Sequence, residues 1–199
     1  MTDAATTTRR PWAYAIFLVI AGFAAWWAAF QLTLDKFALY EDKNAVLSCN
    51  FSLLVQCGKN LNSPEGSAFG FPNPLIGLGG FAAVVAVGVA LLAGAKFDKW
   101  FWWAFNLGIA GALAFVIWLI AQSIFTLNVL CPWCMLVWAV TIPLFWITTI
   151  RNAATGVFGR RLEKAGRVLQ PYAIPLVLVS YVAVAIVAQA RLDVLSYIF

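Results

Sequence analysis

The sequence has no histidine and few charged residues, and both shortages narrow the range of functions that the protein can have. Histidine is the commonest metal ligand and the usual general base near neutral pH, so its absence weakens any zinc site and removes that form of acid–base catalysis. Charged residues make up 11% of the 199 residues, whereas hydrophobic residues make up 63%. A chain this apolar is not an ordinary soluble domain. No flavin-binding or nucleotide-binding motif occurs either, so no cofactor of that kind is indicated.

Long apolar runs occupy most of the chain. A run of about 20 apolar residues is long enough to cross a bilayer as a helix. The sequence predicts five such helices, over residues 12–34, 74–95, 100–125, 131–150 and 171–190. We therefore expect an all-α membrane protein, with a four-helix transmembrane bundle and a fifth transmembrane helix. This single domain covers residues 12–199, and residues 1–11 form a polar tail that we expect to be cytoplasmic.

The one long polar connection is the loop of residues 35–73, which holds two of the four cysteines. Within it, residues 45–55 are apolar enough to predict a short helix at the membrane interface. The loop also contains apolar side chains such as Leu54, Phe69 and Phe71, which predict that it packs into a loop core. Because long loops are usually either functional or disordered, a packed loop of this length indicates a functional one.

The motif Cys131-Pro132-Trp133-Cys134 begins the fourth apolar run. On a helix, positions i and i+3 share a face, so the two sulfurs can meet. Proline suits the first helical turn, where its missing N–H costs nothing. The positive end of the helix favours a thiolate at Cys131, and a thiolate is the species that attacks disulfides. Zinc sites share this spacing, so the motif alone leaves a redox pair, a metal site and a structural pair open.

The order of the predicted helices places all four cysteines on one face of the membrane. Cys49 and Cys57 lie between the first and second helices, and two further crossings return the chain to the same face at Cys131. Most lysines and arginines lie on the opposite face: Arg9, Arg10, Lys96, Lys99, Arg151, Arg160, Arg161, Lys164 and Arg167. The positive-inside rule makes that face cytoplasmic, so the net charge of +5 reflects topology rather than nucleic-acid binding. The cysteines then face the outer compartment, where disulfides persist.

Two cysteine pairs on one oxidising face predict a relay of disulfide exchange. A pair in a loop can reach a soluble partner, and a pair at a membrane helix can reach a lipid-soluble one. Each exchange passes two electrons through a mixed disulfide. A quinone is the natural acceptor in the bilayer, because its apolar tail and aromatic head suit a pocket of Trp, Phe and Leu side chains.

The chain resembles bacterial members of the vitamin K epoxide reductase family over about residues 12–150. Four elements in order carry the resemblance: Cys49 and Cys57 with seven residues between them, Ser63 six residues later, the segment Phe69-Gly70-Phe71-Pro72-Asn73, and the Cys131-Pro132-Trp133-Cys134 motif. Each element alone is weak evidence, but the ordered set is specific.

The resemblance implies a thiol:quinone oxidoreductase in the bacterial inner (plasma) membrane. Cys49 and Cys57 would exchange with a periplasmic thioredoxin-fold (DsbA-like) protein, and Cys131 and Cys134 would pass the electrons to the quinone, with Cys134 nearest the ring. Ser63 would be the family's loop serine, whose hydroxyl supports the active site. Many bacterial members carry a fused thioredoxin-like domain after the fifth helix. This sequence ends at residue 199, so we expect a separate partner, with disulfide formation in exported proteins as the result.

Beyond Cys134, the candidate quinone contacts are Phe69, Asn73, Gln122 and Trp138. Each has an ordinary structural alternative: capping or interhelical hydrogen bonding for the amides, and packing for the aromatic residues. The acceptor is expected to be menaquinone or ubiquinone, and no metal is expected.

Three other interpretations remain open. A DsbB-type quinone-linked thiol oxidase would do the same work, but its C-x-x-C pair lies in the first outer loop. A transporter or scaffold with purely structural disulfides is the alternative from a different class. A zinc site of all four cysteines is the third, although the spacing between Cys49 and Cys57 is loose for it.

The topology makes a direct prediction. Single cysteines retained at position 49 and at position 131 should both react, in reduced protein in sealed membranes, with a small membrane-impermeant thiol reagent added from the outer side, and neither should react with reagent confined to the inner side. Labelling from opposite compartments would contradict the relay, because sulfurs on opposite faces cannot exchange.

Overall fold

The computed structural model describes residues 12–43, 45, 47, 49–50, 52 and 54–194. The predicted cytoplasmic tail, residues 1–11, lies outside the described residues. The elements are α1 (Trp12–Glu41), α2 (Gly58–Asn62), the 3₁₀ turn η1 (Pro64–Ser67), α3 (Pro74–Leu92), α4 (Lys99–Ala121), the π-helical turn η2 (Gln122–Leu127), α5 (Pro132–Ala154), α6 (Arg160–Leu169), the 3₁₀ turn η3 (Gln170–Tyr172) and α7 (Ala173–Leu192).

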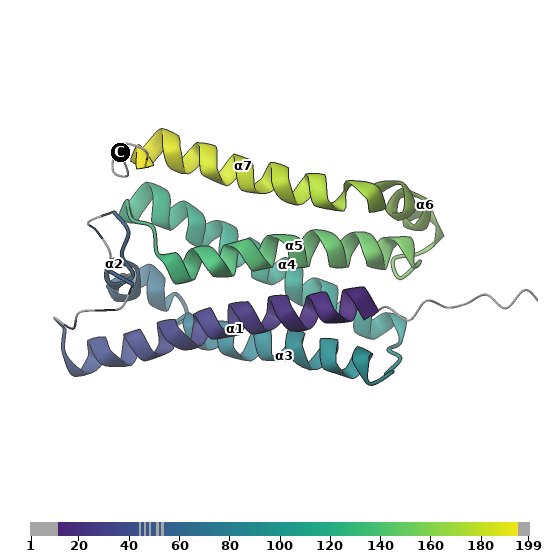
Figure 1. Cartoon of the computed structure of the whole chain (residues 1–199), viewed down its shortest axis with the longest axis horizontal. Coiled ribbons are helices and arrows are strands. Elements are labelled where there is room, and N and C mark those ends of the chain that lie inside the picture. The colour runs from purple at the N-terminus through teal and green to yellow at the C-terminus, as the bar shows by residue number, and fades with distance from the viewer. Residues whose placement is uncertain are drawn as a thin grey trace, which may run out of the picture.

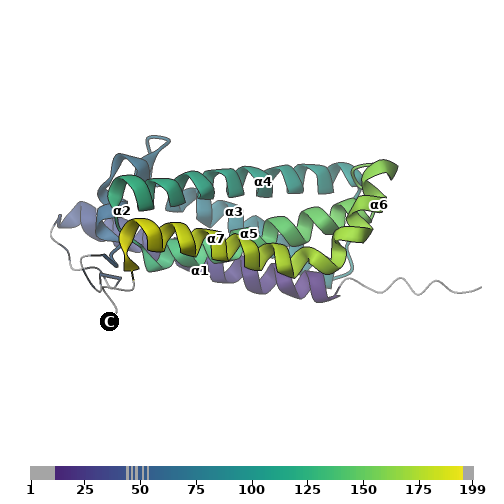
Figure 2. The ribbon, with the colours of Figure 1, turned by 90° about the horizontal axis from the view of Figure 1, so that it is seen from above.

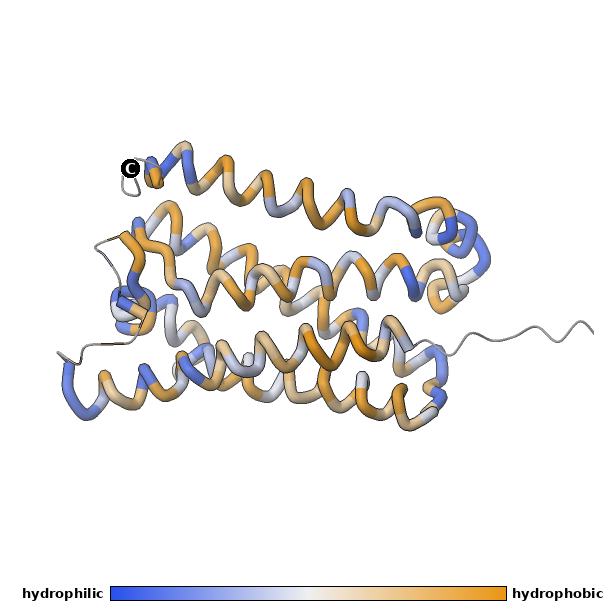
Figure 3. Tube along the Cα trace, in the orientation of Figure 1, coloured by the Kyte–Doolittle hydropathy of each residue, from blue (hydrophilic) through white to orange (hydrophobic). Residues whose placement is uncertain are grey.

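Five long helices run side by side and form an elongated bundle (Figures 1 and 2). Helix α1 packs against α3 and α5, while α5 also contacts α4 and α7. Five helices of the described part of the chain are long and apolar enough to cross a membrane. Apolar residues predominate along the middle of the bundle, and hydrophilic residues gather toward its two ends (Figure 3). The chain is therefore an all-α membrane protein, as predicted.

Helix α1 begins where the sequence predicts but continues to Glu41 rather than ending at residue 34. The extra turns are stable because Lys36 and Leu39 are buried on the face of α1 that meets the loop. Lys36 Nζ donates a hydrogen bond to the backbone carbonyl of Leu61 in α2, at 2.6 Å. The hydropathy pattern predicted that the helix ends where charged residues begin. In the structure the charged side chain of Lys36 has a tertiary partner, and the helix continues past it.

The short helix predicted over residues 45–55 is not found among the residues described there, namely 45, 47, 49–50, 52 and 54–55. The other residues of that segment lie outside the description. A short helix occurs later, as α2 directly after Cys57. Val55 pairs with Leu130 as an isolated parallel β-bridge, which holds the end of the segment in an extended conformation. An extended backbone is incompatible with a helix at that point.

The basic connection before the last transmembrane helix is itself a helix, α6, which crosses the end of the bundle far from α2 (Figure 2). Gly166 allows this crossing, because a side chain at this position would collide with the backbone of α5 at Ala153 and Ala154. Glu163 and Arg167 form an ion pair at 2.5 Å along its surface.

A buried polar cluster ties three helices together at the α6 end. The guanidinium of Arg151 lies 4.5 Å from the ring centre of Tyr14 and 4.4 Å from that of Trp102. Asn152, fully buried, donates to Asn106 Oδ1 at 3.3 Å. These contacts join α1, α4 and α5. They fix the C-terminal end of α5, the helix whose N-terminal end carries the cysteine motif.

Close packing of α1 on α3 gives a stability prediction. A Cβ added to Gly88 would lie 2.8 Å from Val19 Cγ2 and 3.0 Å from the Ala15 carbonyl oxygen, whereas one added to Gly79 in the same helix meets nothing within 4 Å. Gly88→Ala should cost about 1–3 kcal/mol through overpacking. Thermal denaturation in detergent should show a midpoint lowered by several degrees for Gly88→Ala and no loss for Gly79→Ala. Equal midpoints for the two variants would contradict the α1–α3 contact.

Candidate functional site

A short backbone pairing brings the two cysteine motifs together. Gln56 N donates to the Leu130 carbonyl at 3.0 Å, and Leu130 N donates to the Leu54 carbonyl at 2.8 Å. Because Cys57 and Cys131 follow directly on this bridge, they leave it side by side. Ser123, which donates from Oγ to the Val129 carbonyl at 2.5 Å, holds the second strand of the pairing in place.

Helix α5 begins at Pro132, and Cys131 is its N-cap residue. The Cys131 sulfur accepts a hydrogen bond from the backbone N–H of Cys134 at 3.3 Å. A backbone N–H at a helix N-terminus directs partial positive charge at this sulfur. Cys131 is completely buried, while Cys134, one turn into the helix, is only partly buried.

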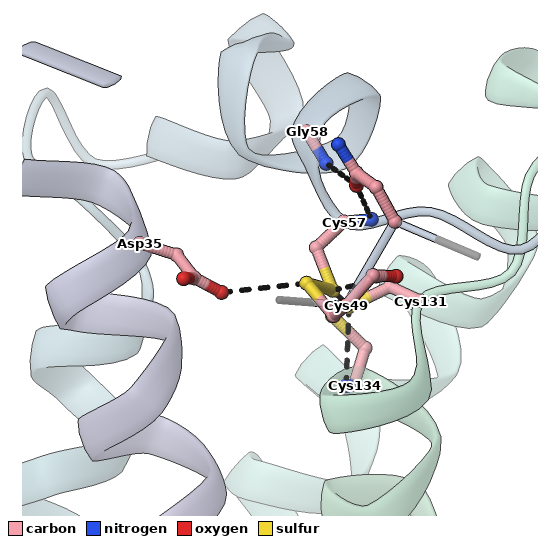
Figure 4. The surroundings of a disulfide bond; sticks show 7 residues. Asp35, Cys49, Cys57, Gly58, Cys131 and Cys134 are labelled. Atoms are coloured by element: carbon pink, nitrogen blue, oxygen red, sulfur yellow. Dashed lines mark hydrogen bonds between the residues drawn. A yellow bond between two sulfur atoms is a disulfide. The ribbon is translucent and has the colours of Figure 1, made fainter. Parts of the chain in front are cut away.

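The four sulfurs form one cluster (Figure 4). Cys49 and Cys57 form a disulfide, and Cys131 and Cys134 are free thiols. The Cys131 sulfur lies 3.2 Å from the Cys57 sulfur. Disulfide exchange proceeds by attack of one sulfur on another, so a thiol in contact with a disulfide is the arrangement that the reaction requires.

Two polar side chains beside the loop disulfide were not identified as site residues from the sequence. Asn50 Oδ1 accepts from the backbone N–H groups of Cys57 and Gly58, at 3.0 and 3.3 Å, and so fixes the turn that carries Cys57. Asp35 Oδ2 lies 3.3 Å from the Cys49 sulfur. A sulfur in a disulfide has no proton to donate, so this contact becomes a hydrogen bond only when Cys49 is a thiol.

Asp35, Cys49 and Cys57 also place their ligand atoms within 4.8 Å of one another, a spacing that a metal ion could use. The two sulfurs are bonded to each other in this structure. A disulfide is a poor ligand compared with the thiolates that bind metals, so the arrangement suits redox chemistry better.

Ser63 lies between α2 and η1 and has a defined structural role. Its hydroxyl donates to the Asn60 carbonyl at 2.9 Å and accepts from Gly66 N at 3.1 Å. Asn73 holds the other side of the same turn, because its side chain donates to the Glu65 carbonyl at 2.6 Å and accepts from Ala68 N at 3.1 Å. Both polar groups of Asn73 are thus engaged by loop backbone, and its side chain makes no capping hydrogen bond to α3, although Asn73 is the N-cap residue of that helix.

A cavity of about 620 Å³ opens beside Cys134. It extends between α1, α3, α4 and α5 under the loop, and its walls are mostly apolar. Cys134 lines it, whereas Cys131 does not, so one thiol faces the cavity and the other faces the loop disulfide. Small residues form part of the wall on α3 and α4: Gly77, Gly80, Ala83, Ala104, Gly108, Gly111 and Ala112.

The structure places the predicted contact residues Phe69, Asn73, Gln122 and Trp138 around this same cavity, together with Ser63. Phe69 is not packed into a loop core as predicted: it is 62% exposed, and its ring centre lies 5.5 Å from that of Phe115 on α4. Phe71 is also exposed, whereas Leu54 is buried as predicted. Which of the lining residues contact a ligand remains a prediction.

A disulfide held against a C-x-x-C dithiol is the arrangement of a thiol–disulfide oxidoreductase, and the comparison with known families agrees with this class. Comparison with protein-family models gives a match to the Vitamin K epoxide reductase family over residues 16–149, which is most of the chain. The chain belongs to this family. No curated protein and no solved structure matches the sequence.

The sulfur contact predicts a specific mixed disulfide. In the double variant Cys49→Ser/Cys134→Ser, Cys57 and Cys131 are left unpaired and in contact, so they should bond under mild oxidation. Peptide mapping by mass spectrometry would detect the crosslink. The matched control Cys57→Ser/Cys134→Ser should give less of a Cys49–Cys131 crosslink, and equal yields in both variants would contradict the observed placement of Cys57.

Proposed function

We propose that the protein is a membrane thiol:quinone oxidoreductase. It takes electrons from a separate thioredoxin-fold (DsbA-like) partner through Cys49 and Cys57, passes them to Cys131 and Cys134, and delivers them to a quinone. The observation that carries the proposal is the 3.2 Å contact between the Cys57 and Cys131 sulfurs, with Cys134 on the wall of the cavity. The outcome for the cell is disulfide formation in exported proteins.

The exchange steps follow from the positions of the sulfurs. The partner's dithiol first reduces the Cys49–Cys57 disulfide, and the partner's own two cysteines become a disulfide. The Cys57 thiolate then attacks Cys131 in an oxidised Cys131–Cys134 pair, which forms a Cys57–Cys131 bond and releases Cys134. Attack of Cys49 on Cys57 restores the loop disulfide and releases Cys131, so two electrons and two protons have moved to the helix pair. The structure corresponds in redox state to the end of this sequence.

Exchange with the partner requires a movement of the loop. Cys49 and Cys57 are 2% and 0% exposed, so a protein thiol cannot reach either sulfur in this arrangement. Cys57 faces Cys131, which leaves Cys49, beside Asp35, as the sulfur directed away from the helix pair. We therefore assign Cys49 to the exchange with the partner, after that part of the loop separates from α1.

The cavity suits a quinone by its chemistry. Its walls are mostly apolar with a few polar side chains, which matches a ring with carbonyl oxygens on a hydrocarbon tail. A quinone bound there would accept the two electrons and two protons that the Cys131–Cys134 pair gives up when it forms a disulfide. The partial burial of Cys134 limits its reaction with other oxidants.

The charge distribution supports the orientation of the protein. The end of the bundle with α6 carries Arg160, Arg161, Lys164 and Arg167, whereas the cysteines lie at the opposite end (Figure 1). We propose a bacterial plasma-membrane location with the α6 end in the cytoplasm and all four cysteines on the outer side. This orientation keeps the disulfide in an oxidising compartment.

Isolated membranes given a reduced thioredoxin-fold protein and a quinone should oxidise that protein. Cys134→Ser and Cys57→Ser should each abolish the activity, because each removes one sulfur that the relay cannot bypass. Extraction of endogenous quinone should also stop turnover in the wild type, and adding it back should restore it. The measurement is the rate of thiol loss in the partner. Activity retained in either variant would reject the relay, and a fold with both pairs permanently oxidised would favour purely structural disulfides.

A further inference from the structure

The carboxyl group of Asp35 lies against the loop disulfide. Asp35 belongs to the part of α1 that continues beyond the predicted helix end, and its side chain points toward Cys49 (Figure 4). Its Oδ2 atom lies 3.3 Å from the Cys49 sulfur, and Cys49 is 2% exposed. An acidic group is therefore in contact with one of the two loop sulfurs, and it is the sulfur that faces away from Cys131.

The position of Asp35 is fixed by its neighbours on α1. Lys36 Nζ donates to the Leu61 carbonyl of α2 at 2.6 Å, which ties this stretch of α1 to the loop. Leu39, one turn further on, is buried in the same apolar cluster as Cys49. Because these contacts join helix and loop on both sides of Asp35, the carboxyl group has a defined place beside the sulfur while the loop is closed.

No described base neutralises the charge of Asp35. Among the described residues, no lysine or arginine forms an ion pair with it. The adjacent Lys36 directs Nζ to the Leu61 carbonyl and lies 4.9 Å from the ring centre of Tyr40, while Lys59 of α2 is exposed. The remaining charged side chains at this end of α1 are also exposed: Glu41, Asp42 and Lys43. The titratable groups at the start of α5 are the two cysteines, so the carboxylate acts chiefly on the sulfurs beside it.

A carboxylate in contact with a sulfur favours the protonated thiol over the thiolate. A thiol can donate its S–H to the carboxylate, whereas a thiolate is repelled by it. At the observed distance the repulsion between two unit charges disfavours the thiolate by about tenfold, even where water screens it. The Cys57 sulfur lies within 4.8 Å of the same ligand atoms but makes its own close contact with Cys131. The effect of Asp35 is therefore larger on Cys49 than on Cys57.

We propose that Asp35 is a specificity-determining residue of the relay, which holds Cys49 as a protonated thiol while the loop pair is reduced. Cys57 then carries the thiolate, and Cys57 is the sulfur in contact with Cys131. The inference rests on the proposed function, because it concerns the order of exchange in that relay. It makes Asp35 a positioning residue that acts through Cys49.

The exchange balances with Asp35 in this role. The Cys57 thiolate attacks Cys131, a Cys57–Cys131 bond forms, and Cys134 leaves as a thiolate while Cys49 keeps its proton. Cys49 then attacks Cys57 and gives its proton to the Asp35 carboxylate, so the loop disulfide forms and Cys131 leaves as a thiolate. The proton passes from Asp35 to a thiolate of the helix pair, directly or through water. Two electrons have moved, Asp35 is unchanged, and no further reactant is required.

The same contact affects the equilibrium of the loop pair. The hydrogen bond to Asp35 exists only when Cys49 is a thiol, so it stabilises the reduced pair and makes the loop disulfide a better oxidant of the partner. The ordinary structural role of Asp35 is that of a polar residue near the membrane surface at the end of α1. That role predicts no effect on the protonation of Cys49 and none on the loop equilibrium.

The first test measures the thiolate of Cys49 directly. Full-length protein with Cys49 as its only cysteine is titrated with pH in detergent, and the ultraviolet absorbance of the thiolate is followed with a chelator present to keep metals off the sulfur. Asp35→Asn removes the charge and keeps the shape, so it should lower the midpoint by about one pH unit, a tenfold gain in thiolate. Asp35→Glu should stay near the parent protein, and the control Glu41→Gln should match it.

The matched protein with Cys57 as its only cysteine tests the selectivity. Asp35→Asn should lower the midpoint of Cys57 by less than that of Cys49. An unchanged midpoint for Cys49 in Asp35→Asn, or an equal fall for both cysteines, overturns the assignment.

A second measurement uses the loop pair alone, in Cys131→Ser/Cys134→Ser protein equilibrated with a thiol buffer. Asp35→Asn should lower the ratio of reduced to oxidised loop pair by about fivefold, because a hydrogen bond to a charged acceptor is stronger than one to a neutral amide. An unchanged ratio contradicts the proposal. Neither measurement uses a quinone or a partner. If both give the expected result and the wild-type protein passes no electrons to a quinone, the proposed function falls while the effect of Asp35 on Cys49 stands.

Discussion

The contact between the Cys57 and Cys131 sulfurs is the constraint on which the rest of the structure depends. These two residues are far apart in the sequence, yet their sulfurs lie 3.2 Å apart. The bridge between Val55 and Leu130 sets their register, and Asn50 fixes the turn at Cys57. The extension of α1 to Glu41 gives the loop a surface to pack on, through the Lys36–Leu61 hydrogen bond. Each of these features serves to hold a loop disulfide against the start of a membrane helix.

The two cysteines of α5 face different surroundings. Cys131, as the N-cap, faces the loop disulfide and is completely buried, whereas Cys134 lines the cavity. In the proposed relay, one helical turn separates the exchange with the loop disulfide from the exchange with a lipid-soluble acceptor. In that relay, electrons from the loop pair reach the acceptor only through the Cys131–Cys134 pair.

The sequence predicted the features that depend on local pattern. Apolar runs identified the five membrane helices, and the spacing of the Cys131–Cys134 motif, with Pro132 within it, predicted a helix beginning there. Features that depend on contacts between distant segments could not be found in this way. The last turns of α1 are polar in sequence and are stabilised by the loop above them. The helix predicted over residues 45–55 gave way, where the segment is described, to pairing with Leu130.

The same distinction applies to the site. The four cysteines and Ser63 were singled out because their spacing is characteristic, whereas Asn50 of the loop and Asp35 of α1 are ordinary polar residues until the fold places them beside the loop disulfide. Ser63 and Asn73, in turn, are explained by the turn that they hold.

The most direct measurement of the central claim is the order in which the two disulfides form in a single turnover. Fully reduced protein in membranes, without any partner, would be mixed with a quinone and sampled by rapid alkylation and mass spectrometry. The account predicts that the Cys131–Cys134 disulfide appears first and is then replaced by Cys49–Cys57, through a transient Cys57–Cys131 species. Oxidation of the loop pair before the helix pair, or at the same rate in Cys134→Ser, would contradict it.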